Sequence, residues 1–263
     1  MSYRTVVAVD LHGYGSKPQN VHAVLQKNLV ECVREAAGNA RLDPGRWRDQ
    51  RSGDGKLMVL PHDVSAEVLV GRFVRELNAG LRDRNRVASP QARTRMRLAL
   101  HHGPAAEAAH GYSGSAPVVA AGLCGAEALR TALDRAGCDL GVIVSKFVYR
   151  GSIESGMTSL DPEDLRAVRV PDLRDDDEAW IWFPGGPNPN DLDFPDGMPD
   201  GPDGGGPGGP PPSGPPGQDP PAPEPRRDPP ATGPTHVTTI NAPGGVVIGR
   251  DQNTITYGFG GRS

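Results

Sequence analysis

Hydrophobic positions change between strand-like and helix-like spacing several times over the first 186 residues. Short apolar runs predict buried strands, and apolar residues three and four apart predict helices that bury one face. The predicted elements, in chain order, are a strand over 5–9, a helix over 19–37, a hairpin with its turn at 53–55, a helix over 65–84, a strand over 95–103, a helix over 114–137, a strand over 140–149 with a short helix behind it, and late strands over 164–170 and 179–185. This alternation predicts an α/β or α+β fold with a mixed sheet.

The composition changes abruptly after this region. The segment 201–217 consists almost wholly of glycine and proline and cannot bury enough apolar surface to order itself. The last stretch returns to β-forming residues but is too short to make a domain of its own. We therefore predict a folded domain over 1–186, a disordered Pro/Gly-rich linker over 187–234 and a β-prone tail over 235–263.

Charge and cysteine usage exclude several classes of protein. The net charge of -4 leaves no basic footprint for nucleic acid, so no nucleic-acid partner is expected. The three cysteines lack CxxC spacing and are expected to be free thiols in a reducing compartment. We see no signal-peptide pattern and no apolar run near the roughly 20 residues of a membrane span. A cytoplasmic chain without a membrane segment is the expectation.

Two carboxylates stand at positions where a metal ion can be held. Asp10 ends the first strand and is followed by the glycine turn 13–15, while Asp54 lies in the tight turn of the predicted hairpin. Both are expected at one edge of the sheet, where two oxygen ligands suit Mg²⁺ or Mn²⁺ shared with substrate phosphates. The alternative is that Asp10 caps a turn and that Asp54 serves only the hairpin, where Asp-Gly is favoured.

The order of these elements resembles the class III nucleotidyl cyclase homology domain, in particular its divergent actinobacterial forms, over about residues 5–186. The resemblance implies an α+β, ferredoxin-like βαββαβ core with two metal-binding aspartates, one in a D-x-x-G-[FY] motif and one in a G-D turn. Asp10 to Tyr14 and Gly53-Asp54 match these motifs. In the family, the backbone after the first aspartate cradles the triphosphate, which assigns nucleotide binding to Leu11, His12, Gly13 and Tyr14.

The chain departs from the family where transition-state groups are expected. The family's helix motif G-x-x-V-N-x-A-x-R supplies an Asn and an Arg, and the aligned positions here are Val118 and Gly122. The usual purine-selecting Lys is replaced by Gln50. Losing one such donor typically costs about 10²–10³ in rate. We therefore assign no catalytic residue to this chain.

Three hypotheses follow for the function. The leading one is a catalytically weak or inactive cyclase homologue that binds nucleotide and divalent metal. An active or partner-dependent cyclase is the first alternative, because the family's site forms across a dimer and a second cyclase-like chain would bring the missing pair. A scaffold that binds no nucleotide is the second. The resemblance implies a homodimer or a heterodimer with another cyclase-like chain.

The tail carries a pattern typical of self-association. It alternates β-formers with Gly, Asn and Gln and has few charges, as do segments that stack in register with copies of themselves. The residues concerned resemble the core of RHIM-like amyloid signalling motifs and are Val246, Val247, Ile248, Gly249, Gln252 and Asn253. The usual core Gln is Val247 here. Tail-to-tail association with RHIM-like partners is predicted, with a docked hairpin or a disordered end as the alternatives.

Overall fold

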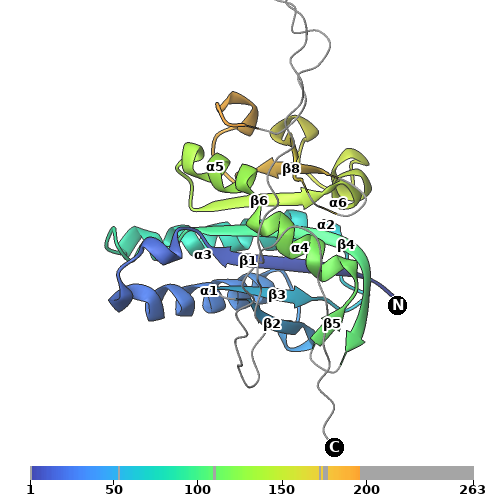
Figure 1. The fold of residues 1–263 in the computed structure, drawn as a ribbon, viewed down its shortest axis with the longest axis horizontal. Helices are drawn as coiled ribbons and strands as arrows, with labels where there is room; N and C mark the ends of the chain where they lie inside the picture. Colours follow the sequence, from blue (N-terminus) through green and yellow to red (C-terminus); the bar gives the residue numbers. More distant parts are fainter. Residues whose placement is uncertain (1, 53, 109–110, 172, 174–176, 196–263) are drawn as a thin grey trace, which may run out of the picture. The chain divides into compact units, whose positions relative to one another are not determined.

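The computed structural model describes residues 2–195 except 53, 109–110, 172 and 174–176. Within these residues eight strands form one mixed sheet in the order β2-β3-β1-β4-β6-β8-β7, with β5 paired to β4 (Figure 1). The strands are β1 Ser2–Leu11, β2 Arg48–Ser52, β3 Gly55–Val59, β4 Met96–Ala108, β5 Gly111–Ser113, β6 Leu140–Ser145, β7 Arg166–Arg169 and β8 Glu178–Trp182. Because β1 pairs antiparallel with both β3 and β4 while β4 pairs parallel with β6, the predicted α+β class with a mixed sheet is confirmed.

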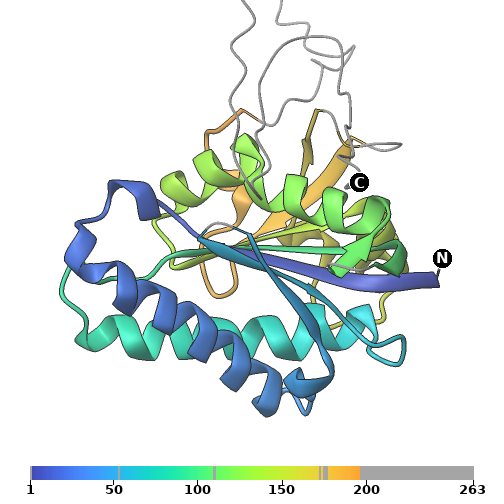
Figure 2. The ribbon, with the colours of Figure 1, turned by 60° about the horizontal axis from the view of Figure 1, so that its bottom comes forward.

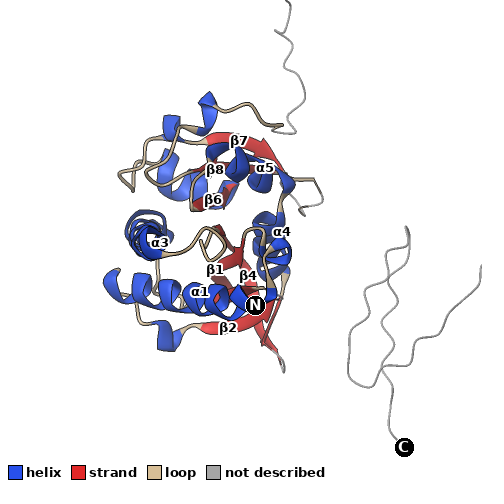
Figure 3. Cartoon of the chain, turned by 90° about the vertical axis from the view of Figure 1, so that its left-hand side faces the viewer, coloured by secondary structure: helices blue, strands red, loops and turns tan. Residues whose placement is uncertain are grey.

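Helices cover both faces of this sheet (Figures 2 and 3). They are α1 Gln19–Asn39, α2 Ala66–Val68, α3 Val74–Val87, α4 Ser115–Gly125, α5 Glu127–Ala136 and α6 Lys146–Val148. Successive side chains of a strand point to opposite faces, and β1 shows the consequence. Val7 and Val9 join the core under α1 and α3, whereas Val6 and Ala8 join the core under α4 and α5.

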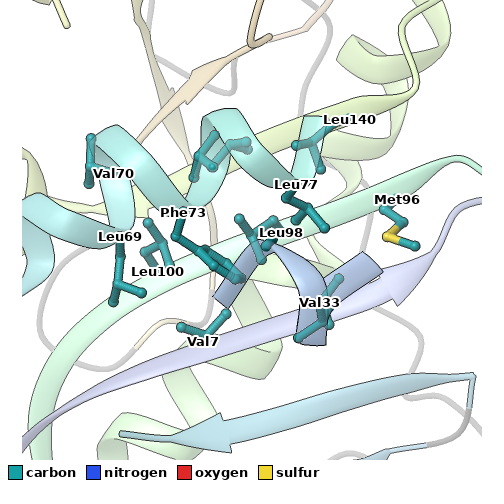
Figure 4. Close-up of a cluster of buried hydrophobic side chains, with 14 of the residues drawn as sticks. Val7, Val33, Leu69, Val70, Phe73, Leu77, Met96, Leu98, Leu100 and Leu140 are labelled. Atoms are coloured by element: carbon teal, nitrogen blue, oxygen red, sulfur yellow. The ribbon is translucent and has the colours of Figure 1, made fainter. Parts of the chain in front are cut away.

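The core under α1 and α3 is closed by a short π-helical turn, Leu69–Phe73, between α2 and α3. The sequence predicts one continuous helix over this stretch, and the structure differs only in the wider turn. That turn buries Leu69, Val70 and Phe73 together, and Phe73 points from its helix toward Val7 and Leu98 (Figure 4). The apolar residues that the sequence places on one helical face are buried here, although the stretch combines a π-helical turn with an α-helix.

The predicted helix over 114–137 is interrupted. It divides into α4 and α5 because Ala126 has an extended backbone, with φ -56° and ψ 135°. By length and composition alone, the segment Ser115–Ala136 is long and apolar enough to cross a membrane. The sequence-based expectation that no apolar run reaches this length is therefore wrong. Its apolar side chains pack on the sheet and half of the segment's most apolar window is buried, as in a helix of a protein core.

The chain after β8 runs back along the sheet edge. Arg166 of β7 holds it by donating hydrogen bonds to the carbonyls of Leu192 (2.7 Å) and Phe194 (3.2 Å), and its guanidinium lies 4.2 Å from the centre of the Phe194 ring. Residues up to 195 therefore contact the sheet. The domain boundary at 186 and the parts that follow it stay predictions, since the linker from 196 onward and the whole tail lie outside the described residues.

Candidate functional site

Asp10 lies at the end of β1 and forms an ion pair with Arg97 of β4. The two residues are direct partners in the antiparallel register of these strands. Arg97 donates from Nε to one carboxylate oxygen at 2.9 Å and from Nη2 to the other at 2.7 Å. This two-point geometry is the strong form of an arginine–carboxylate contact. Only 9% of the Arg97 side chain and 18% of the Asp10 side chain are exposed, so the pair is shielded from water.

Burial, Arg97 and Asp54 all influence the Asp10 carboxyl. Burial raises the pKa of the Asp10 carboxyl above its ordinary value, Arg97 opposes this shift, and the negative charge of Asp54 adds to it. Two carboxylates that repel each other can be held close together when a cation lies between them. The structure thus brings the two predicted metal-binding aspartates to the same edge of the sheet.

Gly55 is the reason that the hairpin can come so close. A Cβ atom on Gly55 would lie 2.4 Å from the Val9 carbonyl oxygen and 2.8 Å from the Asp10 Cβ. The hairpin therefore packs backbone against backbone at the end of β1, with Asp54 one residue before the contact. Glycine is required here for close approach, in addition to the turn chemistry that the sequence indicates.

The donor set fits a divalent cation whose other ligands come from a bound phosphate. Among the described residues no group of three or more His, Cys, Asp or Glu side chains is arranged to hold a metal ion. Mg²⁺ is ordinarily bound by one or two carboxylates together with waters and substrate phosphates. Each Asp10 oxygen accepts one hydrogen bond from Arg97 and keeps further acceptor capacity. Asp10 and Asp54 together match that requirement.

The side chains of the residues that follow Asp10 are buried or engaged in contacts within the domain. Leu11 is buried in the core under α1. The His12 ring lies 2.7 Å from an Asp134 carboxylate oxygen, which Arg95 also contacts, and burial lowers the His12 pKa. Gly13 has φ +70°, which favours glycine, and begins the 3-10 turn Tyr14–Ser16.

Tyr14 is likewise occupied by contacts within the domain. Its ring stacks on His22 with the ring centres 4.1 Å apart, and its hydroxyl accepts a hydrogen bond of 2.9 Å from Gln26. The four residues predicted to bind nucleotide form the last residue of β1 and the start of the turn that follows it. The side chains of His12 and Tyr14 are engaged within the domain and the His12 backbone N–H donates to the Arg95 carbonyl at 2.8 Å, so a phosphate contact would use the backbone at Gly13 and Tyr14.

Helix α4 contains the two positions, Val118 and Gly122, where the resemblance expects an Asn and an Arg that stabilise the transition state. Val118 is 64% exposed, so an apolar side chain stands where the resemblance expects an amide. At Gly122 a Cβ atom would lie 3.0 Å from Leu173 Cδ2, so a long side chain would need Leu173 to move. Apart from the Ser115 hydroxyl and the buried thiol of Cys124, α4 has no polar side chain. This helix has no side chain suited to stabilising charge on a transferring phosphoryl group.

Arg97 was not assigned to the site from the sequence. The available signal is a single charged residue within the apolar run "MRLAL", on a strand where every neighbour is expected to be buried. A buried arginine in such a strand needs a carboxylate partner. The strand pairing that selects Asp10 as this partner appears only in the folded chain.

The predicted self-association residues of the tail, 246–249 and 252–253, lie outside the described residues.

Comparisons with known proteins place the fold. No protein-family model matches the sequence, and no curated protein matches it. Among solved structures, the chain is similar to an adenylate/guanylate cyclase/hydrolase from Silicibacter pomeroyi, with a TM-score of 0.52 and 19% identity, over 70% of this chain and 97% of that chain. The guanylyl cyclase Cya2 is also found, with a TM-score of 0.48 and 15% identity, over 73% of this chain and 96% of that chain. The first likeness shows that the domain has the fold of class III adenylate/guanylate cyclases.

Proposed function

We propose that this cyclase-fold chain is a signalling protein that binds a nucleoside triphosphate with Mg²⁺ or Mn²⁺ and does not cyclise it without a partner. The observation that carries the proposal is the contrast between the two halves of the site. Asp10 ends β1 and Asp54 immediately precedes its partner strand β3, whereas α4 lacks a side chain suited to contacting a transferring phosphoryl group. The chain has a cyclase-like fold and both aspartates, and α4 has neither an amide nor a guanidinium side chain.

The chain's own residues serve binding and orientation. Asp10 and Asp54 would hold the metal, Arg97 fixes the direction of the Asp10 carboxylate, and the turn over 11–14 would present backbone to the phosphates. A divalent metal, when bound, neutralises phosphate charge and activates an attacking oxygen. Cyclisation also requires preorganised donors for charge developing on the α-phosphate, and those donors dominate the rate in related chemistry.

A partner chain is part of the proposal. If the site forms across a dimer, a homodimer brings the same apolar α4 to both of its sites and gains no donor. A heterodimer with another cyclase-like chain would supply an amide and a guanidinium to the Asp10–Asp54 edge. An active, partner-dependent cyclase is thus the second candidate, favoured by the two carboxylates that this chain retains.

The expected result with purified protein is metal-dependent binding without product. Mn²⁺ and each nucleoside triphosphate should give saturable binding by calorimetry, and chromatography should detect neither cyclic nucleotide nor pyrophosphate. Asp54→Asn should weaken binding at least tenfold, because it removes one of the two charges that hold the metal. Asp83→Asn, a matched change at an exposed helix position, should leave binding unchanged.

Two outcomes contradict this proposal in different ways. Cyclic product from the isolated chain would show that α4 needs no donor and that the chain is an active cyclase. Absence of triphosphate binding at millimolar Mn²⁺ would leave the scaffold hypothesis, with Asp10 and Asp54 serving only the turn and the Arg97 pair.

We also propose that the tail recruits the chain by tail-to-tail association with RHIM-like segments. The proposal rests on the sequence alone, namely the run 246–249 followed by Gln252-Asn253 and preceded by a long Pro/Gly-rich segment.

A peptide of residues 235–263 is expected to form fibrils with a cross-β diffraction pattern, whose strand spacing is about 4.7 Å. Replacing Val246 and Ile248 with aspartate should abolish fibril formation, because like charges stacked in register repel. A wild-type peptide that stays monomeric at millimolar concentration would refute this part of the proposal.

A further inference from the structure

The end of β1 carries polar side chains on the sheet face that lies under α4 and α5. Side chains alternate along a strand, so Asp10 and His12 continue the face on which Ala8 is packed. In the neighbouring segment, Arg97 of β4 pairs with Asp10, and the carbonyl of Arg95 accepts a hydrogen bond of 2.8 Å from the His12 N–H. The two polar side chains at this strand end thus lie beside two arginines, which are themselves two residues apart.

Asp134, in the last turn of α5, joins His12 to Arg95. One of its carboxylate oxygens lies 2.7 Å from His12 Nε2 and also accepts a hydrogen bond of 3.0 Å from Arg95 Nη1. A carboxylate has no proton to donate, so the His12 ring is the donor in the first of these contacts. The two residues that meet across the strand end therefore share one acceptor on a helix.

Arg95 fixes this contact relative to the end of α5. Its Nη2 donates to the Leu133 carbonyl at 2.7 Å, and its Nε donates to the Cys138 carbonyl at 2.9 Å. Leu133 belongs to α5, and Cys138 follows Gly137, the residue that ends this helix. A planar guanidinium that donates from all three of its nitrogens has little freedom to move. The end of α5, Asp134 and His12 therefore form one connected network.

His12 stands between the predicted metal ligand Asp10 and the backbone of Gly13 and Tyr14. Only 8% of the His12 side chain is exposed. On the other side of the turn, the Gly13 carbonyl accepts hydrogen bonds from the Ser16 N–H at 3.1 Å and from the Ser16 hydroxyl at 2.8 Å. Because the C=O and N–H of a trans peptide point in opposite directions, the Tyr14 N–H points away from Ser16. Contacts on both sides thus set the direction of the group that a phosphate would meet.

We propose that Asp134 is a positioning residue for the phosphate-binding backbone at Gly13 and Tyr14, and that it acts through His12. The inference rests on the proposed triphosphate binding and adds to it a residue of α5 that touches neither metal nor phosphate. A segment that is already held in its binding conformation loses less freedom when the ligand arrives, and so binds more tightly. Triphosphate affinity therefore depends on where the end of α5 lies.

Metal binding does not depend on the same network. The Asp10 carboxylate is held by its two hydrogen bonds from Arg97, a contact between β1 and β4. Removing the Asp134 carboxylate leaves this pair intact and leaves Arg95 its two carbonyl acceptors. The Asp134 side chain is 56% exposed, and ion pairs at exposed positions contribute little to stability. Asp134→Ala should therefore fold with a Tm close to that of the wild-type chain.

The test measures metal and triphosphate binding separately on the full chain. Calorimetry with ATP or GTP in the presence of Mn²⁺ should show about fivefold weaker binding by Asp134→Ala, because the turn must then be ordered by the ligand. Binding of Mn²⁺ alone, followed by electron paramagnetic resonance, should stay within about twofold of wild type, because the metal needs only carboxylates and water. Asp134→Asn keeps an oxygen that accepts from His12, so its triphosphate affinity should lie between those of Asp134→Ala and the wild-type chain. Asp83→Ala, which removes an exposed helix carboxylate paired with Arg86, should change neither affinity.

Amide hydrogen exchange tests the network without any nucleotide. In Asp134→Ala the His12 amide, which donates to the Arg95 carbonyl, should exchange at least about threefold faster than in the wild-type chain. Unchanged exchange at His12 would show that Asp134 does not hold the turn. Equal triphosphate affinities of Asp134→Ala and the wild-type chain, or an equal loss of Mn²⁺ affinity, would overturn this inference and leave the proposed function standing. Absence of triphosphate binding by the wild-type chain would instead overturn the proposed function, and this inference with it.

Discussion

Replacing Arg97 with methionine should lower the free energy of unfolding at pH 7 by about 3–5 kcal/mol, the usual cost of breaking a buried ion pair on one side. The variant leaves the Asp10 carboxylate shielded from water, without its two hydrogen bonds and without a compensating charge. Chemical denaturation monitored by circular dichroism measures the effect. No other single contact at the site combines this degree of burial with a full charge.

The loss of stability in Arg97→Met should depend on pH. Burial already raises the pKa of the folded Asp10 carboxyl, and removing Arg97 raises that pKa further because the opposing interaction is gone. An acid whose pKa is higher in the folded chain favours folding below its unfolded pKa of about 3.9, and this contribution is lost as pH rises through the folded pKa. The deficit of Arg97→Met relative to the wild-type chain should therefore be largest at pH 7 and shrink toward pH 4.

Two further variants separate the effect of the buried charge from the effect of side-chain geometry. The double variant Asp10→Asn with Arg97→Met has no charge at either position and should recover most of the stability that Arg97→Met loses. Arg97→Lys keeps the positive charge but loses the two-point hydrogen bonding to Asp10. Its free energy of unfolding should therefore lie between those of the wild-type chain and Arg97→Met. A deficit below 1 kcal/mol for Arg97→Met that does not change with pH would show that solvent, rather than Arg97, stabilises Asp10.

Replacing Gly55 with alanine should lower the free energy of unfolding by about 3 kcal/mol, at the upper end of the usual cost of overpacking. The added Cβ would lie 2.4 Å from the Val9 carbonyl oxygen and 2.8 Å from the Asp10 Cβ, and neither atom can rotate away. The hairpin must then move off the end of β1, where Lys56 pairs with Val9. This movement carries Asp54 away from Asp10.

The same variant is informative about function. If metal-dependent triphosphate binding needs both aspartates at one edge, Gly55→Ala should reduce it at least tenfold under conditions where the protein remains folded. Gly38→Ala is the matched control, because nothing lies within 4 Å of its Cβ position in α1 and alanine favours helix over glycine. Unchanged stability and binding in Gly55→Ala would show that the hairpin is not held against β1 in solution.

Much of the candidate site can be predicted from the sequence because its signals are local. The end of a buried strand at Asp10 and an Asp-Gly turn at Asp54 follow from short-range backbone preferences. The structure has the strand and the hairpin where they are predicted. The apolar spacing of α1 likewise predicts a helix that buries one face, and Leu25, Leu29 and Val33 on that face are buried, although Val24 is exposed. Such features depend on residues a few positions apart.

Other features depend on which strands become neighbours. The interruption of the helix at Ala126 leaves no mark in a segment that is apolar on both sides of the break, because packing on the sheet sets the direction of each half. The pairing of Leu100 with Val144 arises only because β4 and β6 are parallel neighbours. Neither residue carries a local signal for that contact.

The sequence by itself determined the carboxylates, the glycine turn and the order of elements, because each rests on local conformational preference and on apolar periodicity. The tertiary structure alone decided that Asp10 is held by Arg97, 87 positions away, and that Gly55 brings the Asp54 turn against the same strand end. Strand register brings together residues that are distant in sequence, and burial then sets the energy of their charges. Those two effects bring two separate sequence motifs together in one candidate site.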